Sequence, residues 1–137
     1  MAGADQTVLN DTNVIITMNT IVNTDATTFD TSVPSKIKLK KAGLYALTAQ
    51  TQWSVYTAFF RSVWIADATT GFLSAEGGAA DDFNDYPQAS GTYIFPVNDV
   101  IELIVHQSSG LSTTIFGGAA GYPDGNWLQA VYLGATL

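Results

Sequence analysis

The chain has 137 residues, no cysteine, one histidine and a formal net charge of −7 from five basic and twelve acidic side chains. A length of this order fits one domain that buries roughly two-thirds of the surface its unfolded form exposes. The absence of cysteine excludes disulfides, thiolate nucleophiles and zinc–thiolate sites. Affinity for a phosphate backbone needs clustered positive charge, so the acidic balance predicts no nucleic-acid partner.

The N-terminal segment predicts a protein made in the cytoplasm without processing. Its first residues, MAGADQTVLND, carry acidic charge and no apolar core, which is the opposite of a signal peptide. No apolar run approaches the roughly 18 residues of a membrane span, so no membrane partner is expected. Residues 1–33 are rich in Thr, Asn and Asp. They leave two interpretations open: a partner-binding arm, or an ordinary first pair of strands.

Apolar and polar residues alternate with a period of two along the chain, interrupted by Gly, Asn, Asp and Pro, which predicts an all-β protein. Residues 77–91, rich in Gly, Ala and Asp, read as a long loop. Strands are expected, in chain order, near residues 7–10, 13–22, 36–40, 44–55, 59–66, 92–97, 100–107, 113–116 and 127–133. About eight or nine short strands at this spacing predict an antiparallel β-sandwich.

Four of the five basic residues lie within residues 36–41. Alternation with apolar neighbours places Lys36, Lys38 and Lys40 on one face of a strand. One interpretation is that these lysines guard a strand edge against unwanted pairing. The other is that they form an electrostatic contact for an acidic partner surface or for an acidic loop of the next subunit.

The order of several short motifs resembles the jelly roll of the tumour-necrosis-factor and complement globular-head family, in a phage-type version. Each motif is short, and the loops carry more Gly and Ala than the secreted heads of that family. The matching segments are Ala42-Gly43-Leu44-Tyr45, where the family has a Gly-x-Tyr strand start, Arg61, Asn98-Asp99-Val100-Ile101-Glu102-Leu103, and the closing strand Trp127-Leu128-Gln129-Ala130-Val131-Tyr132-Leu133-Gly134. The resemblance implies a single jelly-roll domain over residues 1–137 and a homotrimer.

Two strand faces have a mixed rather than a simply polar character. The first alternates along residues 44–52 and the second along the strand that follows Asp99. A mixed second face is typical of a strand that packs against a neighbouring subunit, although a partly exposed face would look the same. The trimer interface predicted from these faces and from the resemblance comprises Leu44, Ala46, Val100, Glu102, Ile104 and His106.

The inventory for chemistry is poor, so we expect neither an enzyme nor a cofactor. His106 is the only histidine, and nothing in the spacing places it beside a nucleophile and an orienting carboxylate. Residues 76–85 supply oxygen donors but lack the spacing of a calcium-binding hand. Two interpretations stay open for them, a solvated acidic loop or a calcium site, and no metal is assigned. Phe83, Tyr86 and Tyr122 lie in Gly-rich segments and either stack on a sugar or pin their loops to the body.

These features together predict a virion structural protein: a trimeric phage head-decoration or cement protein on the capsid exterior, with itself and the major capsid protein as partners. The predicted capsid contact comprises Thr7, Val8, Leu9, Lys36, Lys38 and Lys40. Deletion of residues 1–12 is expected to weaken capsid attachment and to leave the trimer folded. The alternative is a receptor- or carbohydrate-binding head of a tail fibre, in which Phe83, Tyr86 and Tyr122 contact the ligand.

Overall fold

A computed structural model describes residues 5–18, 25–53, 60–79, 87–115 and 126–135, and within residues 72–79 the side chain of Leu73 only. The described residues form strands and turns, and no helix occurs among them. The strands are β1 (Gln6–Val8), β2 (Val14–Ile15), β3 (Phe29–Asp30), β4 (Ile37–Leu39), β5 (Gly43–Gln50), β6 (Phe60–Asp67), β7 (Gly71–Ala79), β8 (Gln88–Phe95), β9 (Val100–Gln107), β10 (Thr113–Ile115) and β11 (Trp127–Gly134).

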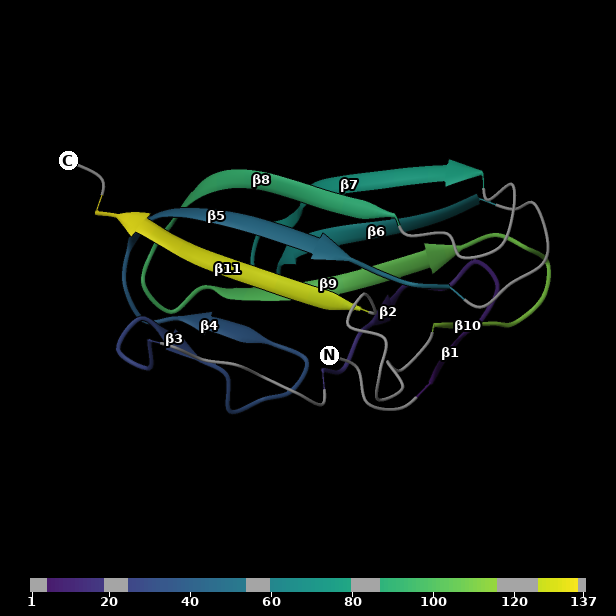
Figure 1. The fold of residues 1–137 in the computed structure, drawn as a ribbon, viewed down its shortest axis with the longest axis horizontal. Coiled ribbons are helices and arrows are strands. Elements are labelled where there is room, and N and C mark those ends of the chain that lie inside the picture. The colour runs from purple at the N-terminus through teal and green to yellow at the C-terminus, as the bar shows by residue number, and fades with distance from the viewer. Residues whose placement is uncertain (1–4, 19–24, 54–59, 80–86, 116–125, 136–137) are drawn as a thin grey trace.

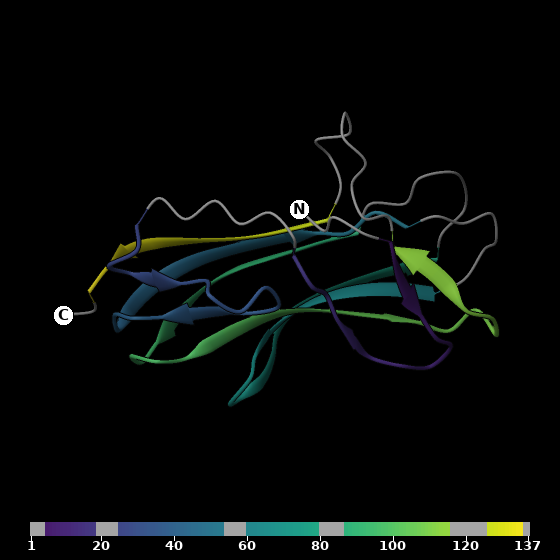
Figure 2. The same cartoon turned by 90° about the horizontal axis from the view of Figure 1, so that it is seen from below.

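The strands pair antiparallel in two large sheets and one small one. The first large sheet has the order β11-β5-β8, and the second has the order β3-β4-β9-β6-β7 with β2 also paired to β9. β1 and β10 form a separate two-stranded ribbon. Figure 1 shows the strand order, and Figure 2 shows the two large sheets as two layers. The predicted fold class, an antiparallel β-sandwich of the jelly-roll type, is confirmed.

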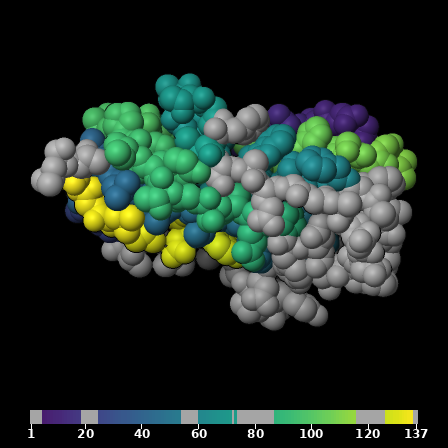
Figure 3. Space-filling model, turned by 90° about the horizontal axis from the view of Figure 1, so that it is seen from above, coloured from purple at the N-terminus to yellow at the C-terminus, as the bar shows by residue number. Residues whose placement is uncertain are grey.

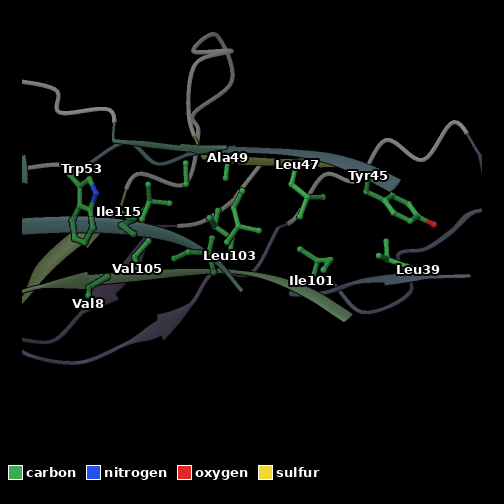
Figure 4. Close-up of a cluster of buried hydrophobic side chains, with 14 of the residues drawn as sticks. Val8, Leu39, Tyr45, Leu47, Ala49, Trp53, Ile101, Leu103, Val105 and Ile115 are labelled. Atoms are coloured by element: carbon green, nitrogen blue, oxygen red, sulfur yellow. The ribbon is translucent and has the colours of Figure 1, made fainter. Parts of the chain in front are cut away.

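The core lies between the two layers because alternate side chains of each sheet point inward. β5 contributes Tyr45, Leu47 and Ala49, and β9 contributes the aliphatic residues at positions 101, 103 and 105. Trp53, Val8 and Ile115 close the core at one end, and Figure 4 shows these side chains between the layers. The face predicted from Tyr45 to Trp53 is therefore buried as expected, while Val55, on the same predicted face, lies outside the described residues.

The Gly-x-Tyr segment at the start of β5 has a packing explanation. Gly43 has a φ of +152°, and a Cβ added there would lie 2.4 Å from the carbonyl oxygen of Gly134 and 2.6 Å from the Tyr132 ring. The Tyr45 ring packs beside Phe29, Phe95 and Tyr132, with centroid separations of 6.0, 5.9 and 5.0 Å. Its hydroxyl donates to the carbonyl of Lys41 at 2.7 Å. Glycine thus leaves room for the Tyr132 ring and the Gly134 carbonyl beside the start of β5, and the Tyr45 ring packs against Tyr132.

The expected long loop over residues 77–91 is wrong at both ends. β7 extends to Ala79 on the edge of one sheet, and β8 begins at Gln88 on the edge of the other. These residues are Gly, Ala, Ser and Gln, which favour turns or neutral positions rather than strands. Pairing with β6 and β5 overrides that local preference. The two-residue strand β3 was likewise not predicted.

Of the two interpretations left open for residues 1–33, the strand pair fits the described part of this segment. β1 pairs with β10, and β2 pairs with β9. Val8 and Ile16 are fully buried in the core. The Gln6 side chain exchanges two hydrogen bonds of 3.0 Å with the backbone of Thr17, which ties the two halves of the segment together.

Candidate interaction surfaces

The residues predicted for the trimer interface lie on two different sheets. Leu44 and Ala46 belong to β5 and alternate with side chains that enter the core. Four residues on β9 also alternate with core side chains: Val100, Glu102, Ile104 and His106. Because both sets point away from the shared core, they lie on opposite outer sides of the sandwich. One contact between two flat faces therefore cannot bury both sets.

Among the described residues, the outward side chains of β11, β5 and β8 include no charged one. We call this outer side of the sheet the uncharged face and define it by four rows of side chains that run across β8, β5 and β11. Gly134 pairs with Leu44, and the adjacent bulge contains Leu133. In order along β5, the rows are Ile94, Leu44 and Leu133; Thr92, Ala46 and Val131; Ser90, Thr48 and Gln129; and Gln88, Gln50 and Trp127. Figure 3 shows atoms of the three strands side by side along the molecule.

Large aliphatic side chains are exposed at one end of the uncharged face. Ile94 is 66% exposed, Leu133 53% and Val131 43%, and Leu44 beside them is half-buried. Single exposed aliphatic residues are normal on protein surfaces, whereas a contiguous group of them marks an interaction site. The first two rows therefore form the best candidate contact surface of the described residues.

The other end of the uncharged face carries amides and hydroxyls. The Gln88 side-chain nitrogen donates to the side-chain oxygen of Gln50 at 2.8 Å. The Thr48 hydroxyl donates to the side-chain oxygen of Gln129 at 3.4 Å. Neighbouring strands are therefore joined through side chains as well as through their backbones.

The outer side of the other large sheet is charged. We call it the charged face, defined by Lys36, Lys38, Glu102 and His106. Glu102 is only 6% exposed, and the Lys36 ammonium lies 3.0 Å from its carboxylate. The predicted interface role of Glu102 stays a prediction, but its charge is already neutralised within the chain.

His106 holds the segment between β1 and β2 on the charged face. Its ring stacks on Trp64 with a centroid separation of 5.7 Å and an interplanar angle of 23°. Its Nδ1 lies 3.0 Å from the side-chain oxygen of Asn13, and its Nε2 lies 3.9 Å from a carboxylate oxygen of Asp11. His106 thus contacts Asp11 and Asn13, which lie within the predicted arm.

Two lysines of the basic cluster bind a turn at residues 25–28. Lys40 donates to the carbonyl of Ala26 at 2.9 Å, and Lys41 donates to the hydroxyls of Thr27 and Thr28 at 3.2 and 2.7 Å. The Asp25 carboxylate accepts hydrogen bonds from the same two threonine hydroxyls and lies 3.9 Å from Lys41. These hydrogen bonds, with a smaller contribution from Lys41, lower the pKa of Asp25 to about 2.

The basic cluster therefore stabilises the chain itself. β4 lies between β3 and β9, so its lysines do not guard the outer edge of the sheet. Lys38 is exposed and lies opposite Asp30 in the β3–β4 register. The pKa of Asp30 is lowered by hydrogen bonds from Ser32 and, to a smaller extent, by the charges of Lys40 and Lys38.

The N-terminal part of the predicted capsid contact contains both buried and exposed side chains. Val8 is fully buried, so its side chain is not available to a partner. Thr7 and Leu9 on either side of it are exposed, Leu9 by 55%. Deletion of residues 1–12 would remove Val8 from the core, so the expectation that this deletion leaves the fold intact does not hold.

The geometry around His106 is not that of a catalytic triad. Ser62 lies opposite His106 in the β6–β9 register, but its hydroxyl is buried and makes no hydrogen bond. A nucleophile must reach both its base and the substrate. Within residues 5–18, 25–53, 60–79, 87–115 and 126–135, no three His, Cys, Asp or Glu side chains gather as a metal site would require.

The predicted ligand-binding aromatics and part of the acidic segment cannot be placed in the fold. Phe83, Tyr86 and Tyr122, predicted for ligand binding, lie outside the described residues, as do Asp81, Asp82 and Asp85. In the part of the chain that is described, no helix is long and apolar enough to cross a membrane.

The exposed aliphatic members of the uncharged face were not predicted from the sequence: Ile94, Val131 and Leu133. A signal was present, because Ile94 alternates with Tyr93 and Phe95, and Val131 and Leu133 alternate with Ala130 and Tyr132. Alternation in one strand cannot show which neighbouring strands share its face. That information comes from the order β11-β5-β8.

Comparisons with known proteins agree on the fold. No protein-family model matches the sequence, and no curated protein matches it significantly. Among solved structures, murine APRIL at pH 5.0 superposes with a TM-score of 0.68 at 11% identity, over 95% of this chain and 98% of that one. Murine APRIL at pH 8.5 superposes with a TM-score of 0.67 at 12% identity, over 93% of this chain and 92% of that one.

An insect protein gives a similar but weaker superposition. Eiger TNF from S. frugiperda has a TM-score of 0.54 at 9% identity, over 98% of this chain and 94% of that one. Likeness over nearly the whole of each chain at such low identity establishes a fold and not a function. The chain has the tumour-necrosis-factor-like jelly-roll fold.

Proposed function

We propose that this chain is a non-enzymatic structural protein that forms a homotrimer through the uncharged face. The observation that carries the proposal is an entire sheet face without charge in a chain whose net charge is −7. Copies of an acidic chain repel each other, and this repulsion is weakest where the meeting surfaces carry no charge. Ile94, Val131 and Leu133 supply apolar area whose burial stabilises the contact.

The assembly is tested by placing a charge on this face. Ile94→Lys adds three buried like charges to a trimer, and we expect the concentration at the midpoint of association to rise by more than about tenfold. Ile15→Lys is the matched control, because Ile15 is 43% exposed on β2, which pairs with β9 in the other sheet. Sedimentation velocity over a range of concentrations measures both. Equal association of the two variants would place the contact elsewhere.

The role proposed for the trimer is decoration of a phage capsid from the exterior, after synthesis in the host cytoplasm. A trimer presents three copies of each outward surface, so weak contacts to several capsid subunits act together. Proteins that bind only the closed lattice also raise the free-energy cost of opening it. The exposed members of the predicted capsid contact supply one apolar, one polar and three cationic groups: Leu9, Thr7, Lys36, Lys38 and Lys40.

Decoration is tested by capsid occupancy after co-sedimentation of the trimer with undecorated heads. Leu9→Asp is expected to lower occupancy by at least about tenfold, because a charge replaces an exposed apolar contact. Val97→Asp is the matched control, since Val97 is similarly exposed, at 52%, and follows β8. If the wild-type protein binds the heads and both variants reach the same occupancy, Leu9 is not part of the contact. No binding of wild-type protein to heads would remove the capsid role and leave the trimer untouched.

A further inference from the structure

The uncharged face has two chemically different halves. The aliphatic half consists of Leu44, Ala46, Ile94, Val131 and Leu133, with Thr92 among them. The polar half consists of Thr48, Gln50, Gln88, Ser90 and Gln129, with Trp127 at its end. The boundary runs straight across three strands, between the second and third rows.

The two halves respond differently to a shift between docked copies. Aliphatic surfaces lose little when they slide past one another, because the hydrophobic effect is non-directional. Amides and hydroxyls that become buried need partners in defined positions, and each one left without a partner costs free energy. A shift of two residues along a strand would bring the polar row of one copy against the aliphatic row of the next.

We propose that the polar half fixes the register and the copy number of the assembly, and that the aliphatic half supplies its affinity. This inference rests on the proposed self-association through the uncharged face. Buried polar groups in other assemblies set register and oligomeric state at a cost in stability. Here the Gln50–Gln88 and Thr48–Gln129 hydrogen bonds hold these side chains in place before docking.

The absence of cysteine makes a direct test of register possible. In a three-fold ring two different patches meet at each contact, and the proposed assembly pairs the β8 side of one copy with the β11 side of the next. Within one chain, β8 and β11 are separated by β5, which places Ser90 and Gln129 about 10 Å apart, too far for a disulfide. The variant Ser90→Cys with Gln129→Cys can therefore be linked only between copies, through residues of the same row.

Mild oxidation followed by non-reducing electrophoresis should convert this variant into a covalent trimer. The matched control is Ser90→Cys with Leu133→Cys, whose two cysteines lie two rows apart, about 13 Å along β11. We expect at least tenfold slower linking of the control. Equal linking rates in the two variants, with the wild type still trimeric, would overturn the fixed register alone. A monomeric wild type would overturn the proposed self-association, and the inference with it.

Copy number is tested by removing the polar groups of the third row. Thr48→Val with Gln129→Met keeps side-chain size and deletes the hydrogen bond between them. Native mass spectrometry should then show several oligomers in place of one, whereas the control Thr92→Val in the aliphatic half should keep a single species. A single unchanged trimer in both variants would contradict the proposal. Should the double variant not fold, Thr48→Val alone gives the same comparison with Thr92→Val.

Discussion

Gly43 shows how one residue determines the path of the chain. The Tyr132 ring and the Gly134 carbonyl lie against its Cα and leave no room for a side chain. Its φ of +152° is also one that L-residues rarely adopt. The Gly-x-Tyr pattern noted in the sequence is therefore required by the packing of β5 against β11, which are the first and last strands of this sheet in chain order. Its presence predicts the fold and says nothing about a ligand.

Replacement of Gly43 by alanine should lower the free energy of unfolding by about 2–4 kcal/mol, because the added methyl group meets backbone and ring atoms and the backbone is strained. Gly110→Ala is the matched control: Gly110 also has a positive φ of +81°, yet no atom lies within 4 Å of the added Cβ. We expect a loss of about 1 kcal/mol there from strain alone. Chemical denaturation measures both, and equal losses would contradict the packing explanation.

Asp25 makes the stability of the 25–28 turn depend on pH. Hydrogen bonds from Thr27 and Thr28 lower its pKa to about 2, so the stabilisation is fully present above its ordinary value of 3.8 and is lost as the pH falls toward 2. Thr28→Val removes one of these donors without changing shape, and the pKa of Asp25 should rise toward 3.8. Carbon-13 NMR titration of the carboxyl group follows this change. An unmoved titration midpoint in the variant would show that the Thr28 hydroxyl does not support the carboxylate.

At the scale of strands, the sequence predicted most elements whose side chains alternate clearly and missed those that depend on neighbours. β5, β9 and β11 alternate between apolar and mixed positions and were found from that pattern. The later part of β7, residues 74–79, and the first half of β8 are built from small and polar residues and exist because β6 and β5 pair with them. Local composition cannot reveal such strands, since their stability comes from non-local hydrogen bonds.

Only part of the uncharged face was predicted from the sequence. Leu44 and Ala46 were identified because they alternate with the buried Tyr45 and Leu47. The β9 residues were grouped with them because their face has the same mixed character and because of the family resemblance, although the two strands belong to different layers. The order of the strands in a sheet decides which mixed faces combine into one surface. The alternation of residues within each strand does not reveal that order.

Tyr93 joins the edges of the two layers. Its hydroxyl donates to the carbonyl of Leu73 on β7 at 2.8 Å, and its ring lies over Gly91, where a Cβ would come within 2.2 Å of the hydroxyl oxygen. Tyr93→Phe should lower the free energy of unfolding by about 1 kcal/mol. Hydrogen exchange should accelerate in β7 more than in β5. Equal acceleration in both strands would mean that Tyr93 does not specifically hold the β7 edge.

For the whole molecule, the separation of charge between two outer faces is the main functional feature. The charged face carries Lys36, Lys38, Glu102 and His106, and the uncharged face lies on the other side of the core. A molecule built in this way can meet its own copies on one side and present charges on the other. Of the basic residues that cluster in the sequence, Lys36 and Lys38 belong to the charged face, and Lys36, Lys40 and Lys41 already stabilise the chain itself.

Self-association through a face without charge also predicts how the assembly responds to its solution. Ion pairs weaken as salt rises, whereas the burial of apolar area does not. The assembly should therefore persist in high salt and in the presence of a chelator. Dissociation at high salt would point to the charged face as the contact.

The most direct measurement is the absolute mass of the unaltered protein in solution, by light scattering coupled to size exclusion, at low and high salt. The account predicts three chain masses under both conditions and over a wide range of concentrations. A single chain mass at high protein concentration would contradict self-association through the uncharged face and leave Ile94, Val131 and Leu133 as exposed surface of a monomer.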